Sequence, residues 1–181
     1  MNYQVKQAKK EKEDKEESYF PSFSFCSFFS GIKLLHTMQR TLILLKPDCM
    51  QKKLCGKVLA HFEDAGFKII GCKMIKLDLD TLREHYAHIA DFEFYPEVEK
   101  FMSSTPVIAL VLEGEGIIDQ MREKLGVTDC LEAALGTIRE EYGSKEEGDS
   151  KMRNVVHASD SEGTAAEEIK RFFKENELFE Y

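Results

Sequence analysis

Residues 151–161, K-M-R-N-V-V-H-A-S-D-S, decide how this chain is expected to fold. The β-branched pair Val155 and Val156 predicts a short strand that delivers His157 to a turn. The polar run that follows predicts the start of a helix, with Thr164 as its N-cap. A histidine between a strand and a helix is held firmly and can still meet solvent.

His157 has two interpretations. A lone histidine at the end of a strand is most often a structural residue that is hydrogen-bonded to its surroundings. The alternative is a catalytic nucleophile, because free imidazole has an ordinary pKa near ~6.5 and its neutral form is abundant at neutral pH. Residues elsewhere in the chain decide between these two interpretations.

Strands and helices alternate along the chain from residue 40 onwards. Apolar runs predict three further strands, over residues 40–45, 67–77 and 106–112. Helical spacing and turn residues predict helices over residues 51–65, 80–88, 96–102, 116–125 and 164–174, with a loop or weak helix at 128–136.

This order corresponds to two β-α-β units, the split βαβ plan of a ferredoxin-like sheet. We therefore predict an α+β fold (βαββαβ), in which a four-stranded antiparallel sheet carries helices on one face and leaves room for a site above it. A doubly wound parallel sheet is the alternative, although four strands are few for that architecture.

Composition limits the classes of function. The chain has 181 residues, 43% of them hydrophobic and 32% charged, which supports one domain with a real core. Its formal net charge of -8 argues against a general binder of nucleic acids or anionic membranes, so a nucleotide site needs its own cluster of cations. Five cysteines without a C-x-x-C pair indicate a reducing compartment, and we expect a cytoplasmic protein without a disulfide framework.

The N-terminal region differs from the rest. Residues 1–18 alternate lysines with acids, and residues 19–35 are rich in aromatic residues and serine. The first stretch lacks the positive excess of a signal peptide, and Pro21 and repeated serines interrupt the second. We predict that residues 1–37 are a disordered or dispensable extension and that residues 38–181 form the compact domain; a targeting leader is the alternative.

Candidate phosphate-binding residues are spread along the compact domain. Lys46 follows a predicted strand and precedes a proline, which fixes its position. Arg122, Arg139 and Asn154 add donors suited to phosphate or hydroxyl oxygens. No G-x-x-x-x-G-K-[ST] sequence is present, which excludes a P-loop kinase.

Several motifs together match one family. They are K-P-D at 46–48, H-Y at 85–86, Phe94, S-T-P-V at 104–107, Arg122 with L-G at 125–126, G-T-I-R at 136–139 and N-V-V-H-A-S-D-S at 154–161. The chain resembles nucleoside diphosphate kinase, in its bacterial-type form with a short C-terminus, throughout residues 38–181. The resemblance implies a ferredoxin-like fold and ping-pong transfer of the γ-phosphate of a nucleoside triphosphate, typically ATP, to a nucleoside diphosphate. Its intermediate is a phosphohistidine, and its biological role is to maintain nucleotide pools.

The resemblance also implies the catalytic roles. His157 is the expected nucleophile, through Nδ1 as in the family, and Glu168 on the last helix is the residue expected to orient its ring. The residues alone favour an exposed acid at Glu168. Lys46 and Tyr86 match the residues that contact the transferred phosphoryl group.

The nucleotide-binding roles follow in the same way. Arg122, Thr128 and Arg139 match the family's phosphate clamp, and Asn154 matches its contact to a sugar hydroxyl. Phe94 matches the ring that stacks on the base; a core aromatic is the alternative. Such stacking, without hydrogen bonds to base edges, is tolerant of purines and pyrimidines alike.

Mg²⁺ and self-association are further implications of the resemblance. Mg²⁺ is expected to bind mainly through the nucleotide phosphates, with no dedicated protein ligands. A homo-oligomer, either a tetramer or a hexamer, is expected. The chain departs from the family pattern at Ala158, at Leu135, at Phe92-Glu93 and in a longer loop over residues 140–153. The loop changes bear on the geometry of the oligomer.

Two other classes of function remain open. The first is a catalytically silent interaction or nucleic-acid-binding protein, against which the intact His157 and the acidic net charge argue. The second is a metal-binding module that uses His85, His88 and Asp91, although their spacing drifts around a helix.

Overall fold

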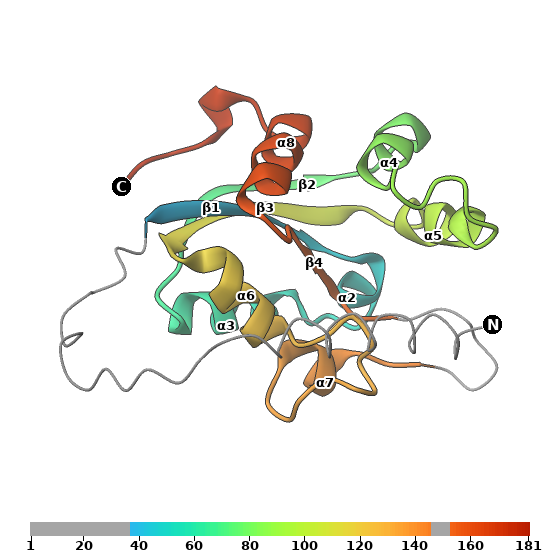
Figure 1. The fold of residues 1–181 in the computed structure, drawn as a ribbon, viewed down its shortest axis with the longest axis horizontal. Coiled ribbons are helices and arrows are strands. Elements are labelled where there is room, and N and C mark those ends of the chain that lie inside the picture. Colours follow the sequence, from blue (N-terminus) through green and yellow to red (C-terminus); the bar gives the residue numbers. More distant parts are fainter. Residues whose placement is uncertain (1–36, 146–152) are drawn as a thin grey trace, which may run out of the picture. The chain divides into compact units, whose positions relative to one another are not determined.

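A computed structural model describes residues 37–145 and 153–181. Four strands form one antiparallel sheet in the order β2-β3-β1-β4 (Figure 1). The strands are β1 (Met38–Leu45), β2 (Lys68–Ile75), β3 (Val107–Glu115) and β4 (Val156–Ala158). Because β3 lies between β1 and β2, and β1 between β3 and β4, both βαβ units are split. The α+β ferredoxin-like prediction is confirmed, and the parallel alternative is wrong.

The helices are more numerous than the sequence pattern predicted. They are α2 (Pro47–Gln51), α3 (Cys55–Asp64), α4 (Leu79–His85), α5 (Tyr95–Met102), α6 (Ile117–Leu125), α7 (Ile138–Tyr142), α8 (Glu162–Phe172) and a 3-10 turn (Glu175–Glu177). The helix expected over residues 51–65 is α3, which begins four residues later because a turn at residues 52–54 separates it from α2. Both α2 and α7 have five residues, which is too short for an apolar period to be visible.

Helices cover both faces of the sheet, so the expectation of one covered face is wrong. Figure 1 shows α4, α5 and α8 on one side of the sheet and α3, α6 and α7 on the other. Alternate residues of β1 belong to two separate cores, since Leu42 packs with the first group and Ile43 with the second. The cause is the unbroken apolar run of β1, which leaves no polar face for water.

The last helix begins earlier than predicted. Ser161, in an extended conformation, is the N-cap, and its Oγ accepts a hydrogen bond from the backbone N–H of Thr164 (3.1 Å). Thr164 therefore lies in the first turn of α8 and is not its cap. Ala165, Glu168 and Phe172, spaced by three and four residues, form the buried face of the helix.

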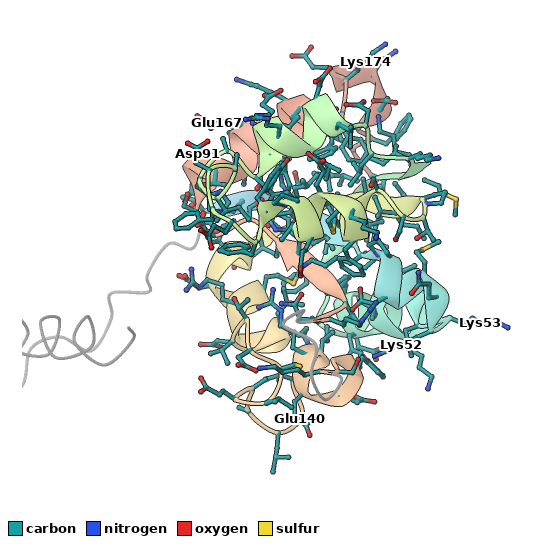
Figure 2. The ribbon with its side chains drawn as sticks, turned by 90° about the vertical axis from the view of Figure 1, so that its right-hand side faces the viewer. Lys52, Lys53, Asp91, Glu140, Glu167 and Lys174 are labelled. Carbon is teal, nitrogen blue, oxygen red and sulfur yellow. The ribbon has the colours of Figure 1, made fainter. Side chains whose placement is uncertain are left out.

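Charged side chains extend from the surface of the molecule, as Lys53 and Lys174 illustrate (Figure 2). Within the described ranges, no helix has the length and apolar character needed to cross a bilayer. The predicted extension lies outside the described residues except for Thr37. So do residues 146–152 of the longer loop, of which Ser144 and Arg153 form the base through a β-bridge.

Candidate active site

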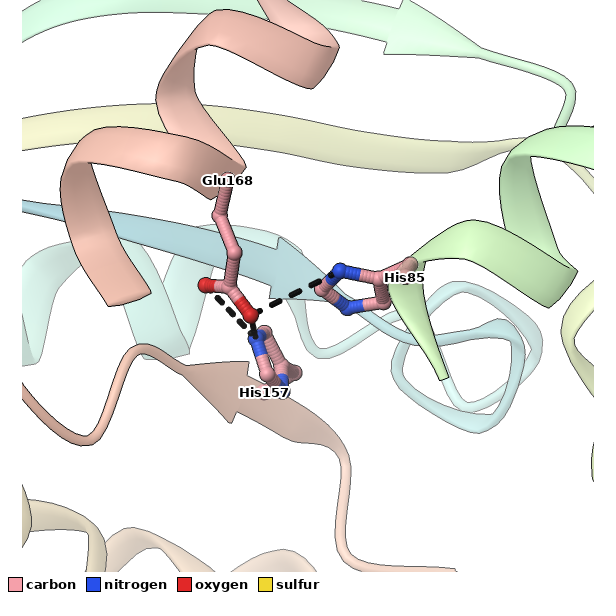
Figure 3. Close-up of side chains that lie close together, drawn as sticks. All are labelled: His85, His157 and Glu168. Carbon is pink, nitrogen blue, oxygen red and sulfur yellow. Dashed lines mark hydrogen bonds and ion pairs between the residues drawn. The ribbon is translucent and has the colours of Figure 1, made fainter. Parts of the chain in front are cut away.

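His157 and Glu168 meet where β4 faces α8 (Figure 3). Nε2 of His157 lies 3.1 Å from Oε1 and 3.2 Å from Oε2 of Glu168. Ser159, two residues further along, donates its hydroxyl to Oε2 of the same carboxylate (2.6 Å). Because Nε2 is committed to Glu168, Nδ1 is the ring nitrogen that remains for chemistry.

Glu168 is ionised although its side chain is only 6% exposed. Burial by itself raises the pKa of this carboxyl group. The hydrogen bond and charge interaction with His157, together with the Ser159 hydroxyl, outweigh burial and hold the pKa below its ordinary value. Glu168 is therefore a buried anion facing the imidazole, and the sequence-based alternative of an exposed acid is wrong.

His85, at the end of α4, is the second histidine of the site. Its Nδ1 lies 3.5 Å from Oε1 of Glu168, and its ring centroid lies 4.6 Å from that of His157 (Figure 3). Burial, followed by the neighbouring His157, lowers the pKa of His85 to about 3, so the ring is neutral at physiological pH. Neither ring nitrogen has a hydrogen-bond partner.

The structure does not bring together the alternative metal site over His85, His88 and Asp91. His88 and Asp91 are exposed, and Asp91 extends from the surface (Figure 2). Among the described residues, the group whose atoms are close enough to hold a metal is His85, His157 and Glu168, with all ligand atoms within 4.8 Å of one another. Glu168 is already engaged there by His157 and Ser159.

Lys46 and Asn154 are held together beside His157. Nζ of Lys46 donates to Oδ1 of Asn154 (2.7 Å), and Nδ2 of Asn154 donates to the backbone oxygen of Thr128 (2.9 Å). Burial and then the charge of Arg139 lower the pKa of Lys46 to about 8, against an opposing effect of Asp48. An anion bound here would stabilise the charged ammonium group of Lys46.

Arg139 is fixed at the start of α7. Its Nη1 donates to the backbone oxygen of Gly126 (2.8 Å) and its Nη2 to that of Val156 (3.1 Å). Burial, and then the charge of Arg122, lower the pKa of this guanidinium group. Arg122 itself is exposed on α6 and lines neither of the two cavities of the site.

Two adjoining cavities share Lys46, Tyr86, Thr128 and Asn154 in their linings. The first, of about 620 Å³, also contains His85, Arg139, His157 and Glu168. The second, of about 500 Å³, has an apolar wall that includes Phe94. Together they offer a charged compartment next to an apolar one, within the usual size range of small-molecule sites.

Phe94 lies on the rim of the apolar cavity. It is 50% exposed, so the alternative of a core aromatic is wrong. Its ring stacks against Phe92, with centroids 5.4 Å apart and planes inclined by 21°. Tyr86, by contrast, is buried, and burial followed by the charge of Glu168 raises its pKa, so its hydroxyl remains a donor.

The support beneath His157 was not apparent from the sequence. Val155 has φ of 56°, a strained conformation for a β-branched residue. Two hydrogen bonds hold it: its N–H donates to Oδ2 of Asp48 (3.0 Å), and its carbonyl accepts from the N–H of Lys46 (2.9 Å). Arg153, which lies over the Phe101 ring and lines the apolar cavity, was also missed. Only the charged residues at 48 and 153 offered a signal, and nothing in V-V indicated strain.

Ala158, which departs from the family pattern after the histidine, is accommodated. It is paired with Ile43 inside β4 and is not among the described residues with positive φ. An alanine therefore fits where the resemblance leads one to expect glycine.

Most of the chain is similar in sequence to known proteins. The sequence profile of the family described as nucleoside diphosphate kinase matches residues 39–178. The nucleoside diphosphate kinase of Rhodopirellula baltica is 44% identical over 144 residues, which cover 80% of this chain and 91% of that protein.

Solved structures agree. The nucleoside diphosphate kinase of Aquifex aeolicus superposes with a TM-score of 0.74 at 40% identity, covering 79% of this chain and all of that one. A transition-state mimic of the Borrelia burgdorferi nucleoside diphosphate kinase, with bound vanadate and ADP, gives a TM-score of 0.74 at 33% identity and covers 80% and 92% of the two chains. This chain belongs to the nucleoside diphosphate kinase family of phosphotransferases.

Proposed function

We propose that this protein transfers the terminal phosphate of a nucleoside triphosphate to a nucleoside diphosphate in two half-reactions, through a phosphohistidine at Nδ1 of His157. The observation that carries this proposal is the contact between Nε2 of His157 and Glu168. It leaves Nδ1 as the nucleophilic nitrogen and sets an ionised carboxylate behind the ring, where positive charge develops during attack.

In the first half-reaction, Nδ1 attacks the terminal phosphorus in line with the leaving oxygen. The bond from nitrogen to phosphorus forms, the bond to the β-phosphate oxygen breaks, and the nucleoside diphosphate departs. A second nucleoside diphosphate then attacks the phosphohistidine by the reverse path. Apart from the attack by His157, the protein makes and breaks no bonds. Catalysis therefore depends mainly on placement of the phosphates and neutralisation of their charge.

The charged cavity supplies that neutralisation. Lys46 and Arg139 provide two partly buried cations, and the protonated Tyr86 hydroxyl provides a neutral donor to the transferred group. Thr128 completes the phosphate contacts. Arg122, exposed on α6, is proposed to reach the phosphates from outside the cavity lining.

The apolar cavity is proposed to hold the nucleoside. Phe94 offers a half-exposed ring face on which a base can stack, and Asn154 lies between the two compartments, where a ribose hydroxyl would sit. Stacking alone discriminates weakly among bases, which fits an enzyme that serves all nucleotides.

The residues of this site fit an Mg²⁺ ion that binds together with the nucleotide. The carboxylate nearest His157, Glu168, is engaged by His157 and Ser159, and Glu84 pairs with Arg171. Asp160 and Glu167 are exposed at the margin of the lining and could hold the ion through water. When bound, Mg²⁺ would neutralise phosphate charge and keep most of its ligands from phosphates and water.

A homo-oligomer, either a tetramer or a hexamer, is proposed as the working form. Leu131 and Leu135 are 69% and 90% exposed on the segment between α6 and α7, and a partner subunit would cover them. A cytoplasmic location and an extension at residues 1–37 that is dispensable for activity are part of the same proposal. We expect no specific nucleic-acid binding, given the net charge of -8.

A phosphoenzyme assay tests the proposed function. The protein is incubated with γ-labelled ATP and Mg²⁺, and the label should be acid-labile and base-stable. His157→Asn should take up no label. Equal labelling of His157→Asn would contradict the proposal.

A further inference from the structure

Two thiols lie in contact beneath the active site. Sγ of Cys49 in α2 and Sγ of Cys55 at the start of α3 are 4.0 Å apart. Sδ of Met50 lies 3.2 Å from the Cys55 sulfur. The turn at residues 52–54, with Lys53 at φ 58°, folds α3 back and brings the two cysteines together. Their spacing, C-x5-C, carries no signal of such a pair.

We propose that Cys49 and Cys55 form an oxidisable dithiol, which a hydroperoxide closes to a disulfide with loss of phosphotransfer activity. The activity part of this inference rests on the proposed function, whereas formation of the disulfide does not. No cysteine is needed for the mechanism proposed above, so the thiol pair is an additional site of modification.

The chemistry balances with a hydroperoxide as the sole oxidant. The thiolate of Cys55, whose proton has passed to solvent, attacks the peroxide. The S–O bond of a sulfenic acid forms, the O–O bond breaks, and the departing hydroxide or alkoxide takes up a proton from solvent to become water or an alcohol. The Cys49 sulfur then attacks the Cys55 sulfur. The S–S bond forms, the S–O bond breaks, and the departing hydroxide takes the Cys49 proton and leaves as a second water.

The difference in solvent exposure between the two thiols decides which one is oxidised first. Cys55 is partly exposed and is the sulfur that an oxidant reaches, whereas Cys49 is fully buried. Burial, and then the neighbouring Cys55, raise the pKa of the Cys49 thiol, which therefore stays protonated until the sulfenic acid is formed beside it. We expect closure to be slower than oxidation of Cys55 for this reason.

Closure requires movement. A disulfide has a bond length of about 2.05 Å, so the sulfurs must approach by roughly 2 Å. The backbone is already folded for this, because the N–H of Leu54 donates to the carbonyl of Cys49 (3.0 Å). We expect the displacement to fall on α2, because it has five residues and α3 has ten.

Movement of α2 reaches His157 through Asp48. Asp48 directly precedes Cys49, and its carboxylate holds the strained Val155, two residues before His157. Lys46, at the N-cap of α2, holds the other side of Val155. A misplacement of about 1 Å can cost roughly 10²-fold in rate, so we expect kcat to fall by about tenfold or more on closure.

The experiment uses the full chain, treated with hydrogen peroxide and then trapped with an alkylating agent. Peptide mapping should find Cys49 joined to Cys55, kcat should fall, and dithiothreitol should restore both. Cys55→Ser should have unchanged basal activity, form no such crosslink and keep its activity under peroxide. Cys72→Ser removes an exposed cysteine on β2 and should behave as the unmodified chain does.

Three results would overturn the inference: no Cys49–Cys55 peptide, a crosslink without a fall in kcat, or equal inactivation of Cys55→Ser. Failure of the proposed function gives a different pattern, because the reduced protein would then show no phosphotransfer while the peptide map still reports the crosslink.

Discussion

Nε2 of His157 is bracketed by both oxygens of Glu168, at 3.1 and 3.2 Å, on an otherwise apolar face of α8. A buried carboxylate is costly unless it is paired and hydrogen-bonded. Here the pairing comes from His157 and from Ser159, both on or next to β4. The short strand and the last helix therefore hold the ring in one orientation before any nucleotide arrives.

Glu168→Gln tests whether this carboxylate orients the ring and balances its charge. The variant keeps the size of the side chain and removes its charge, so we expect the rate of phosphoenzyme formation to fall roughly 10²-fold, as oriented catalytic groups typically cost when lost. Glu162→Gln, exposed at the start of the same helix and outside the linings of both cavities, is the matched control and should be near the unmodified rate. Rapid-quench kinetics would measure both; a change within twofold in Glu168→Gln would contradict the role.

His85 should make the fold sensitive to acid. Its pKa is about 3 in the folded state and ordinarily 6.5, so between these values the unfolded chain binds a proton that the folded chain does not. The stability contribution is therefore lost as pH falls, by about 2 kcal/mol between pH 7 and pH 5. Denaturant unfolding of His85→Phe should show a smaller loss over this range than the unmodified chain.

The exposed His88→Phe is the control for that comparison and should keep the full acid sensitivity. Identical pH profiles for all three proteins would show that His85 is not neutral in the folded state. We also expect His85→Phe to keep its fold, because the substitution removes two ring nitrogens that lack partners and preserves an aromatic ring.

The affinity for nucleotides should fall at alkaline pH, because Lys46 loses its charge. With a pKa of about 8 in the free protein, its ammonium group is lost as pH rises from 8 towards 9.5, and the phosphates lose one cationic partner. Isothermal titration with ADP should show falling affinity over this range. Lys46→Arg, which stays charged, should show a flatter profile even if its affinity is lower. An unmodified protein with constant affinity from pH 7 to 9.5 would rule the role out.

Removal of residues 1–37 should leave kcat and KM unchanged, because the family profile and every candidate site residue lie beyond them. Steady-state assays of the full and shortened chains would decide the matter. A large loss of activity would assign the extension a part in the enzyme.

The long, strongly patterned elements were predictable from the sequence. The runs that became β1 and β3 fixed the central strands, and the order of strands and helices gave the topology. The second covered face was not foreseen, because a strand that is buried on both sides has no alternation to reveal which helices cover it. The cap of α8 was missed because Ser161 and Thr164 are both good N-caps in isolation, and only backbone geometry separates them.

The site residues that belong to sequence motifs could be predicted. His157, Lys46 and Asn154 lie together as expected, and Arg122 is the expected site residue that lies outside both cavities. His85 and Asp48 were missed as supports because their roles depend on distances across the fold. Contacts between residues far apart in sequence leave no local pattern to read.

Identification of the atom that carries the phosphoryl group is the most direct test of the account. Phosphorus and nitrogen NMR of the ¹⁵N-labelled phosphoenzyme, compared with His157→Asn, would identify the modified atom. The account predicts phosphorus bonded to Nδ1 of His157. Phosphorus on Nε2, or on another side chain, would contradict the central role of the Glu168 contact.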